Sequence, residues 1–262
     1  MRAVNRTTGV ARQTISDLLE DIGQACSEYQ DGAFHNLGCE VIECDEIWSF
    51  CYSKQKNVPE EHKGTFGYGD IWTWTAIDAD TKLVPSWLVG ERTAKDAYTF
   101  LYDLRERLAP GRIQITTDGH KPYLQVIEPL FGADRVDFAM LHKIYGPDGV
   151  VIEGRYSPAA CTGIDVRIIT GQPDPDRIST SYVERQNLTM RMGMRRFIRL
   201  TNGFSKKVEF QAHAVSLYFM HYNLARPHQT LTKRYGRKTT PAMAAAVADH
   251  VWSVWEIAGL LD

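Results

Sequence analysis

Alternation of apolar and polar residues predicts three strands in the first third of the chain. Residues 41–53 read VIECDEIWSFCYS, a run rich in β-branched and aromatic side chains that is typical of a strand. Residues 71–90 contain two similar runs separated by DADTK, a sequence that favours a turn, so this segment is predicted to be a hairpin. Together these runs predict three antiparallel strands.

The periodicity then changes, and helices alternate with single strands. Residues 93–109 form an amphipathic pattern, with Thr93 as the expected N-cap and Pro110-Gly111 ending the helix. The elements expected after it are a strand ending at 118, a helix at 121–132, a strand at 135–144, an irregular insertion at about 145–180, a helix from about 180, a helix at about 205–224 and a last helix that begins at Thr240-Pro241. This order predicts an α/β fold with a mixed sheet flanked by helices.

The first 30 residues are predicted to form two helices separated by a break at Thr8-Gly9. The second helix would carry Arg12, Gln13 and Thr14 near its start, which is the arrangement of a helix-turn-helix unit that reads DNA. A plain amphipathic helical hairpin is the alternative that the pattern leaves open.

Charge is distributed unevenly along the chain. The net charge of −2 over 262 residues gives no indication of a nucleic-acid partner. Between residues 184 and 207, however, seven basic residues stand against one acid, a local balance of 7 − 1 = +6. Because salt confines an electrostatic field to roughly 10 Å, this local asymmetry says more about partners than the total does.

Cysteine usage and hydropathy exclude several classes of protein. The five cysteines include no CxxC pair and are odd in number, which argues against a zinc ribbon and a disulfide framework. Free thiols fit a reducing cytoplasm. The amino-terminal residues have no apolar core of a signal peptide, and no apolar run approaches the ~20 residues of a membrane span.

Three acidic residues stand out as candidates for catalysis. Asp45 lies in the middle of the first apolar strand, where an acid is costly unless it is paired or bound to a cation. Asp118 ends the fourth predicted strand, at the kind of sheet edge where α/β proteins place their sites. Glu184 lies on the basic helix, and a helix packed across neighbouring first and fourth strands would bring it close to both aspartates.

Three carboxylates on one patch repel one another unless a cation compensates them, and oxygen ligands suit Mg²⁺ or Mn²⁺. Two such ions about 3.5–4 Å apart would clamp the attacking and leaving oxygens of a phosphodiester. The residues alone leave plainer readings open: Asp118-Gly119 is a turn, Glu184 is a surface charge, and Glu43 or Glu46 takes the strand position. Glu153 and Asp176 are further acids to which the role would pass if Glu184 had none.

Basic and polar side chains supply candidates for contacts with DNA phosphates. Leu188, Arg191 and Arg195 share one stripe of the helix with Glu184, so one helix face would hold metal and DNA together. The candidate DNA-binding residues are Arg6, Arg12, Gln13, Thr14, Arg185, Arg191, Arg195, Arg196, Arg199, Lys206, Lys207, Arg226 and His228.

Several segments carry a resemblance to a known family. They are ECDEIWSF, TTDGHKPY, RYSPAACTG, GQPDPDRISTSYVERQNLTMRMGMRRFIRLTNGFSKK, YFMHYNLARPHQTL and TPAMAA. Through them the chain, from about residue 5 to 255, resembles the IS1-family bacterial insertion-sequence transposases, whose catalytic core is a DDE, RNase H-like domain. Members of that family commonly begin with a cysteine-rich zinc ribbon, and this chain departs from the pattern there.

The resemblance implies that Asp45, Asp118 and Glu184 are the acidic triad, at separations of 118 − 45 = 73 and 184 − 118 = 66 residues. It implies an RNase H-like sheet at 31–225, a partial helix-turn-helix unit at 1–30 and a carboxy-terminal helical extension at 226–262. The implied activity is metal-dependent cleavage at transposon ends and transfer of the 3′-OH into target DNA, by a dimer or larger homo-oligomer on double-stranded DNA. A metal nuclease without strand transfer and a non-catalytic DNA-binding regulator are the alternatives.

Overall fold

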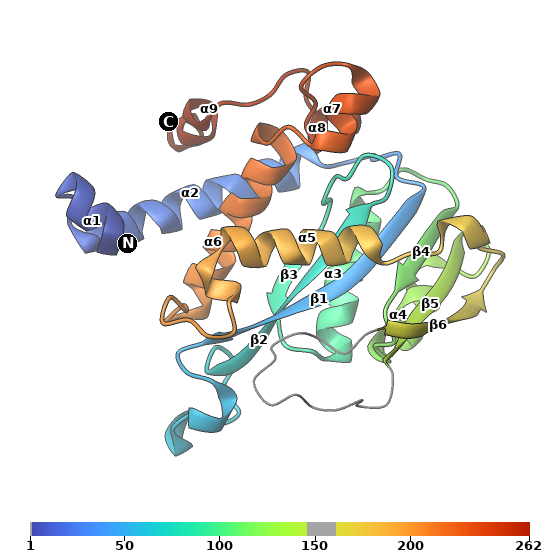
Figure 1. The fold of residues 1–262 in the computed structure, drawn as a ribbon, viewed down its shortest axis with the longest axis horizontal. Helices are drawn as coiled ribbons and strands as arrows, with labels where there is room; N and C mark the ends of the chain where they lie inside the picture. The colour runs from blue at the N-terminus through green and yellow to red at the C-terminus, as the bar shows by residue number, and fades with distance from the viewer. Residues whose placement is uncertain (1, 146–160) are drawn as a thin grey trace.

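The computed structural model describes residues 2–145 and 161–262 and has a six-stranded sheet at its centre (Figure 1). The strands are β1 (Val41–Cys51), β2 (Gly69–Asp78), β3 (Trp87–Gly90), β4 (Ile113–Thr117), β5 (Val136–Tyr145) and β6 (Cys161–Thr170). They lie in the order β3-β2-β1-β4-β5-β6. β1 and β5 run parallel to β4, and the other neighbours are antiparallel.

The predicted hairpin and the alternation of helices and strands are confirmed. β1, β2 and β3 form the antiparallel half of the sheet. Helices α3 (Ala94–Arg107) and α4 (Pro122–Phe131) follow at the expected places, and the Thr93 hydroxyl accepts the Asp96 N–H at the start of α3. This mixed sheet flanked by helices is consistent with an RNase H-like fold.

Helices cover both faces of the sheet. On one face α3 and α4 bury an apolar core that includes Phe100, Tyr123 and Phe138. On the other face lie α5 (Ser181–Gly193) and α6 (Val208–Met220), with Val183 and Phe219 packed on the sheet. Figure 1 shows α5 lying across the sheet in front of β1. Within the described residues, no helix combines the length and apolar character that crossing a membrane requires.

The amino-terminal helices are α1 (Arg2–Thr8) and α2 (Arg12–Ala33), joined through Gly9 in the left-handed backbone region. The second half of α2 packs on α6 and on the carboxy-terminal segments, whereas α1 buries no residue. A helix-turn-helix unit normally rests on a supporting helix and a small core. The break and the second helix lie where expected, but the helix-turn-helix assignment stays a prediction.

Two expectations about the second half of the chain are wrong. Residues 161–170 were expected to be irregular but form strand β6, because apolar and polar residues alternate there and pair with β5. The helix expected from Thr240-Pro241 does begin there as α8 (Pro241–Ala244), with the Thr240 hydroxyl as its cap, but it is only four residues long and α9 follows it, so it is not the last helix. The remaining short elements are η1 (Gln55–Asn57), η2 (Glu60–His62), η3 (Pro175–Arg177), η4 (Arg195–Phe197), η5 (His221–Ala225), α7 (Gln229–Tyr235), α9 (Val254–Ala258) and η6 (Gly259–Leu261).

Candidate metal-dependent active site

The register of the two central strands brings Asp45 and Asp118 together. β1 and β4 run parallel, and Cys44 lies opposite Thr117 at the last registered pair. The next residue on each chain segment is an aspartate, so Asp118 leaves the end of β4 beside Asp45. The predicted neighbourhood of the first and fourth strands is therefore confirmed.

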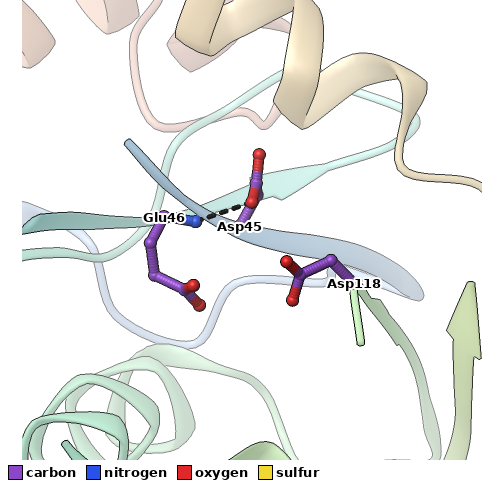
Figure 2. A group of neighbouring side chains, drawn as sticks. All are labelled: Asp45, Glu46 and Asp118. Carbon is purple, nitrogen blue, oxygen red and sulfur yellow. Dashed lines mark hydrogen bonds between the residues drawn. The ribbon is translucent and has the colours of Figure 1, made fainter. Parts of the chain in front are cut away.

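Glu46 joins the two aspartates. One carboxylate oxygen from each of Asp45, Glu46 and Asp118 lies within 4.8 Å of the others. Figure 2 shows the Asp45 and Glu46 side chains leaving β1 in opposite directions, with the Asp118 side chain beside them. Glu46 is buried, and its Oε1 has no hydrogen-bond partner of normal geometry among the described residues, although the Tyr123 side chain is near enough to lower the pKa of this carboxyl group. From the sequence, Glu46 was expected only as a rival of Asp45 for the strand position, not as its companion.

Two side chains of β1 attach α5 to the sheet. Fully buried Glu43 accepts the backbone N–H groups of Tyr182 (2.7 Å) and Val183 (3.0 Å) in the first turn of the helix. One turn later Asn187 Nδ2 donates to Asp45 Oδ2 at 2.8 Å. Because residues two apart on a strand share a face, Glu43 and Asp45 hold the helix at two points. Glu43 thus orients α5 and is itself removed from the acidic cluster.

Glu184 lies on the side of α5 that faces this part of the sheet. Its Oε1 accepts the Thr180 hydroxyl at 2.8 Å, and its Oε2 pairs with the Lys143 ammonium from β5. Its charge contributes to the raised pKa of Asp45, so the two carboxylates interact. Its oxygens are not part of the close group formed by Asp45, Glu46 and Asp118. Glu184 is therefore near enough to act on the charge of Asp45, and in this structure its carboxylate is paired with Lys143.

Burial and mutual repulsion change the protonation of the cluster. Burial, and secondly the charge of Asp118, raises the pKa of Asp45 to about 7. The same two causes, in the same order, raise the pKa of Glu46 to about 8, although the Arg92 guanidinium 2.9 Å away lowers it. These carboxyl groups hold protons near neutral pH unless a cation replaces them.

The donor set suits a divalent cation. Converging carboxylates with an unpartnered oxygen on Glu46 are the hard ligands that Mg²⁺ and Mn²⁺ prefer. Arg92 balances part of the cluster's charge, because it reaches Glu46 and, at 3.4 Å, Asp118, whereas Lys143 balances the neighbouring Glu184. The residues present therefore fit a metal site, with Asp45 and Asp118 at its centre.

We expect Mn²⁺ to bind at least about tenfold more tightly at pH 8 than at pH 6. In the metal-free protein Asp45 carries a proton below a pKa of about 7, and the metal must displace it. The raised pKa also means that the metal-free fold loses stability as pH rises from the ordinary aspartate value through 7. Calorimetric titration with Mn²⁺ at pH 6, 7 and 8 tests this, with exposed Glu60→Gln as control; affinity independent of pH would contradict it.

Some residues of the site carry no recognisable signal in the sequence. Arg92 follows β3, and Lys143 and His142 lie on β5, each in a stretch that sequence analysis assigned only to secondary structure. A Cβ on Gly119 would lie 2.3 Å from the His142 ring, so the glycine after Asp118 makes room for this histidine. Tertiary structure alone brings them to the site: the ion pairs of Arg92 place it there, and the pairing of β5 with β4 places Lys143 and His142.

A basic cavity lies on the neighbouring face of α5. Arg185 from α5 and Arg226 and His228 from the segment before α7 line a hollow of about 340 Å³ together with Lys82. None of the described residues that line it carries a carboxylate. His228 Nδ1 is buried without a hydrogen-bond partner. Arg226 and His228 therefore lie beside the helix that carries Glu184, and their contact with DNA stays a prediction; Lys82 was not among the predicted residues.

The other candidate DNA-binding residues fall into three groups. Arg191 is half-buried and interacts with the charge of Asp45, while Arg196 is half-buried and donates to Ser205. Exposed residues after α5 are Arg195, Arg199, Lys206 and Lys207. Exposed residues of α1 and the first turn of α2 are Arg6, Arg12, Gln13 and Thr14, at the end of α2 that points away from the sheet (Figure 1). Glu153 lies outside the described residues, and Asp176 lies in η3.

Comparisons with known proteins give little further information. No protein-family model matches the chain, and no curated protein matches it. Among solved structures, the chain is similar to the piggyBac transposase synaptic complex with hairpin DNA, at a TM-score of 0.36 and 9% sequence identity. The likeness covers 80% of this chain and 51% of that one, so the chain spans about half the length of the protein it matches. At this TM-score the fold assignment rests on the topology described above.

Proposed function

We propose that the chain is a DNA transposase that cleaves transposon ends and joins the released 3′-OH to target DNA. The observation that carries the proposal is the placement of Asp45 and Asp118 side by side on parallel central strands, with Glu184 on a basic helix attached across them. An acidic centre bordered by arginines is the arrangement that phosphodiester chemistry on a polyanion requires. It also agrees with the resemblance to the IS1 family.

Each residue has a distinct role in this proposal. Asp45, Asp118 and Glu184 hold two Mg²⁺ or Mn²⁺ ions, which supply the activation of water and the stabilisation of the leaving 3′ oxygen. Asn187 keeps the Asp45 carboxylate oriented through its 2.8 Å hydrogen bond. For Glu184 to bind metal, its pair with Lys143 must open, and the lysine then faces the incoming phosphate.

Substrate binding falls to the basic side chains. The basic cavity beside α5 suits the phosphates next to the scissile bond, because none of its described lining residues is acidic and it lies on the face of α5 next to Glu184. Its basic side chains are Lys82, Arg185, Arg226 and His228. Arg195, Arg199, Lys206 and Lys207 extend the basic surface beyond the end of α5. The exposed first turn of α2, with Arg12, Gln13 and Thr14, is placed to contact DNA sequence at a distance from the cut. Such a protein works at the nucleoid.

The test uses the purified chain and a labelled duplex copied from the DNA that borders its gene, with Mg²⁺ or Mn²⁺ and a plasmid target. The proposal predicts cleavage at a defined phosphate followed by joining of the labelled strand to the plasmid. Cleavage without joined product would identify a metal nuclease instead. Binding to the duplex without cleavage under either metal would identify a non-catalytic regulator.

Removing single arginines is expected to weaken binding to all DNA sequences alike. Arg195→Ala and Arg226→Ala should each reduce the slope of log affinity against log salt by roughly 1, because each removes one phosphate contact. Arg105→Ala is the matched control, since Arg105 lies on α3 at the opposite face of the sheet and pairs with Glu106. Anisotropy titrations from 50 to 300 mM salt measure the slopes; unchanged slopes would place the DNA elsewhere.

A further inference from the structure

Strand β6 is an unprotected edge of the sheet. It ends the strand order, and within the described part of the chain no strand pairs with its outer side. Ile164, Val166 and Ile168 are 59%, 44% and 58% exposed, although they alternate as the apolar side of a strand should. Proteins usually protect edges of this kind with lysine, proline or a bulge. The register shifts of β6 lie at its two ends, at Thr162 and Ile169, and residues 164–168 between them pair regularly and contain neither lysine nor proline. This edge is therefore a site where a strand of another chain can pair.

The exposed stripe lies on the same face of the sheet as the acidic site. Ile164 is registered with Lys143 on β5, and Lys143 pairs with Glu184. Val166 is registered with Leu141, whose side chain is buried on that same face. The two charged residues between the apolar positions, Asp165 and Arg167, occupy the opposite face and pair with each other at 2.9 Å.

We propose that β6 pairs antiparallel with β6 of a second copy of this chain, about a two-fold axis through Val166. In this register Asp165 lies opposite Arg167 of the second copy and Arg167 opposite its Asp165. Ile164 lies opposite Ile168 in the same way, so each apolar side chain meets an apolar one. The sequence Ile-Asp-Val-Arg-Ile is therefore complementary to itself when it is reversed, which is what a two-fold symmetric interface requires.

Neighbouring registers are worse. A shift of one residue would turn the apolar side chains of one copy to the charged face of the other. Moving the axis to Asp165 or to Arg167 keeps the faces but sets two like charges directly opposite, which is destabilising. The charges thus select the axis at Val166 among the registers that join apolar to apolar.

The pairing places both acidic sites on one side of a continuous sheet, because a two-fold axis perpendicular to the sheet exchanges its edges and keeps its faces. Seven interstrand spacings of about 4.8 Å separate the two β1 strands, so the sites lie on the order of 30 Å apart. If the proposed function holds, two DNA ends can approach the dimer from the same side. The interface itself does not depend on that function.

Charge reversal tests the interface without DNA or metal. The wild-type chain should form a dimer in sedimentation experiments, and Asp165→Arg or Arg167→Asp should weaken it at least about tenfold by setting like charges opposite. Mixing the two single variants should restore association, since arginines of one then face aspartates of the other. The double variant Asp165→Arg/Arg167→Asp should also dimerise by itself. Its two charges are exchanged, so opposite charges still face each other across the interface and within each copy.

A cross-link supplies the second measurement. In a Cys161→Ser background, Val166→Cys should form a disulfide-linked dimer on mild oxidation, because position 166 meets its own copy at the axis. Leu124→Cys on α4 is the control, with 43% exposure against 44% for Val166. A wild-type chain that stays monomeric at about 100 μM, single variants that dimerise normally, or equal cross-linking at positions 124 and 166 would each overturn the proposal.

Discussion

Glu184→Gln should lose DNA cleavage by at least about a thousandfold, which corresponds to about 4 kcal/mol in activation free energy. Without divalent metal it should bind DNA as tightly as the wild type or more tightly, because a negative charge near the phosphates is removed. Asp45→Asn and Asp118→Asn should lose cleavage to the same degree. If Glu184 were a surface partner of Lys143, its loss would remove only an exposed ion pair worth ~0–1 kcal/mol and leave cleavage nearly normal.

Glu46→Gln is the decisive companion variant. Glu46 lies closer to the two aspartates than Glu184 does, but Arg92 already pairs with it on the other face of β1. We expect Glu46→Gln to lower the cleavage rate about 10–100-fold, which is typical of changing a residue that contacts metal ligands without binding the metal itself. Cleavage and metal-free affinity are measured on one labelled duplex, with melting curves to verify folding. Near-normal cleavage by Glu184→Gln together with complete loss in Glu46→Gln would assign the third ligand position to Glu46.

Gly23→Ala should destabilise the fold by about 3 kcal/mol, the upper end for overpacking a close contact. Gly23 lies where α2 crosses α6, and a Cβ there would lie 2.4 Å from His213 Cβ and 2.7 Å from His213 Cα. A shift of α6 away from Gly23 would also stretch the hydrogen bond that the Ser216 hydroxyl, three residues after His213, donates to the Gly23 carbonyl at 2.7 Å. A change of this size lowers the melting temperature by roughly 6–12 °C in a chain of this length.

Gly32→Ala on the same helix is the matched control. A Cβ at Gly32 meets nothing within 4 Å, and the residue is exposed. Alanine has the higher helix propensity, so this variant should be neutral or more stable by at most about 1 kcal/mol. Thermal unfolding followed by circular dichroism measures both. Equal melting temperatures for the two variants would show that α2 and α6 are not in close contact in solution.

Local sequence patterns predicted most of the secondary structure, for reasons that act over a few residues. The apolar alternation of β1, the turn between β2 and β3, and the capping hydroxyl of Thr93 each involve neighbours in the chain. Strand β6 was missed because the glycine and aspartate residues around it favour a loop. Its partner β5 also ends at Tyr145, well before β6 begins at Cys161, so no short turn signal links the two strands. The capping residue Thr240 and Pro241 predicted where α8 begins, but the local pattern did not show that the helix ends after four residues.

For the candidate site, the sequence by itself determined that an aspartate lies within a strand, that another ends a strand and that a glutamate begins a basic helix. Tertiary structure alone decided that Cys44 registers with Thr117, which sets Asp45 beside Asp118. It also decided that Glu46 and Arg92 enter the cluster and that Lys143 meets Glu184. These contacts join residues at least 26 positions apart, from Arg92 to Asp118, and strand register and helix docking depend on packing of the whole core. Charge and periodicity along the chain do not determine that register, because it depends on how the strands and helices pack.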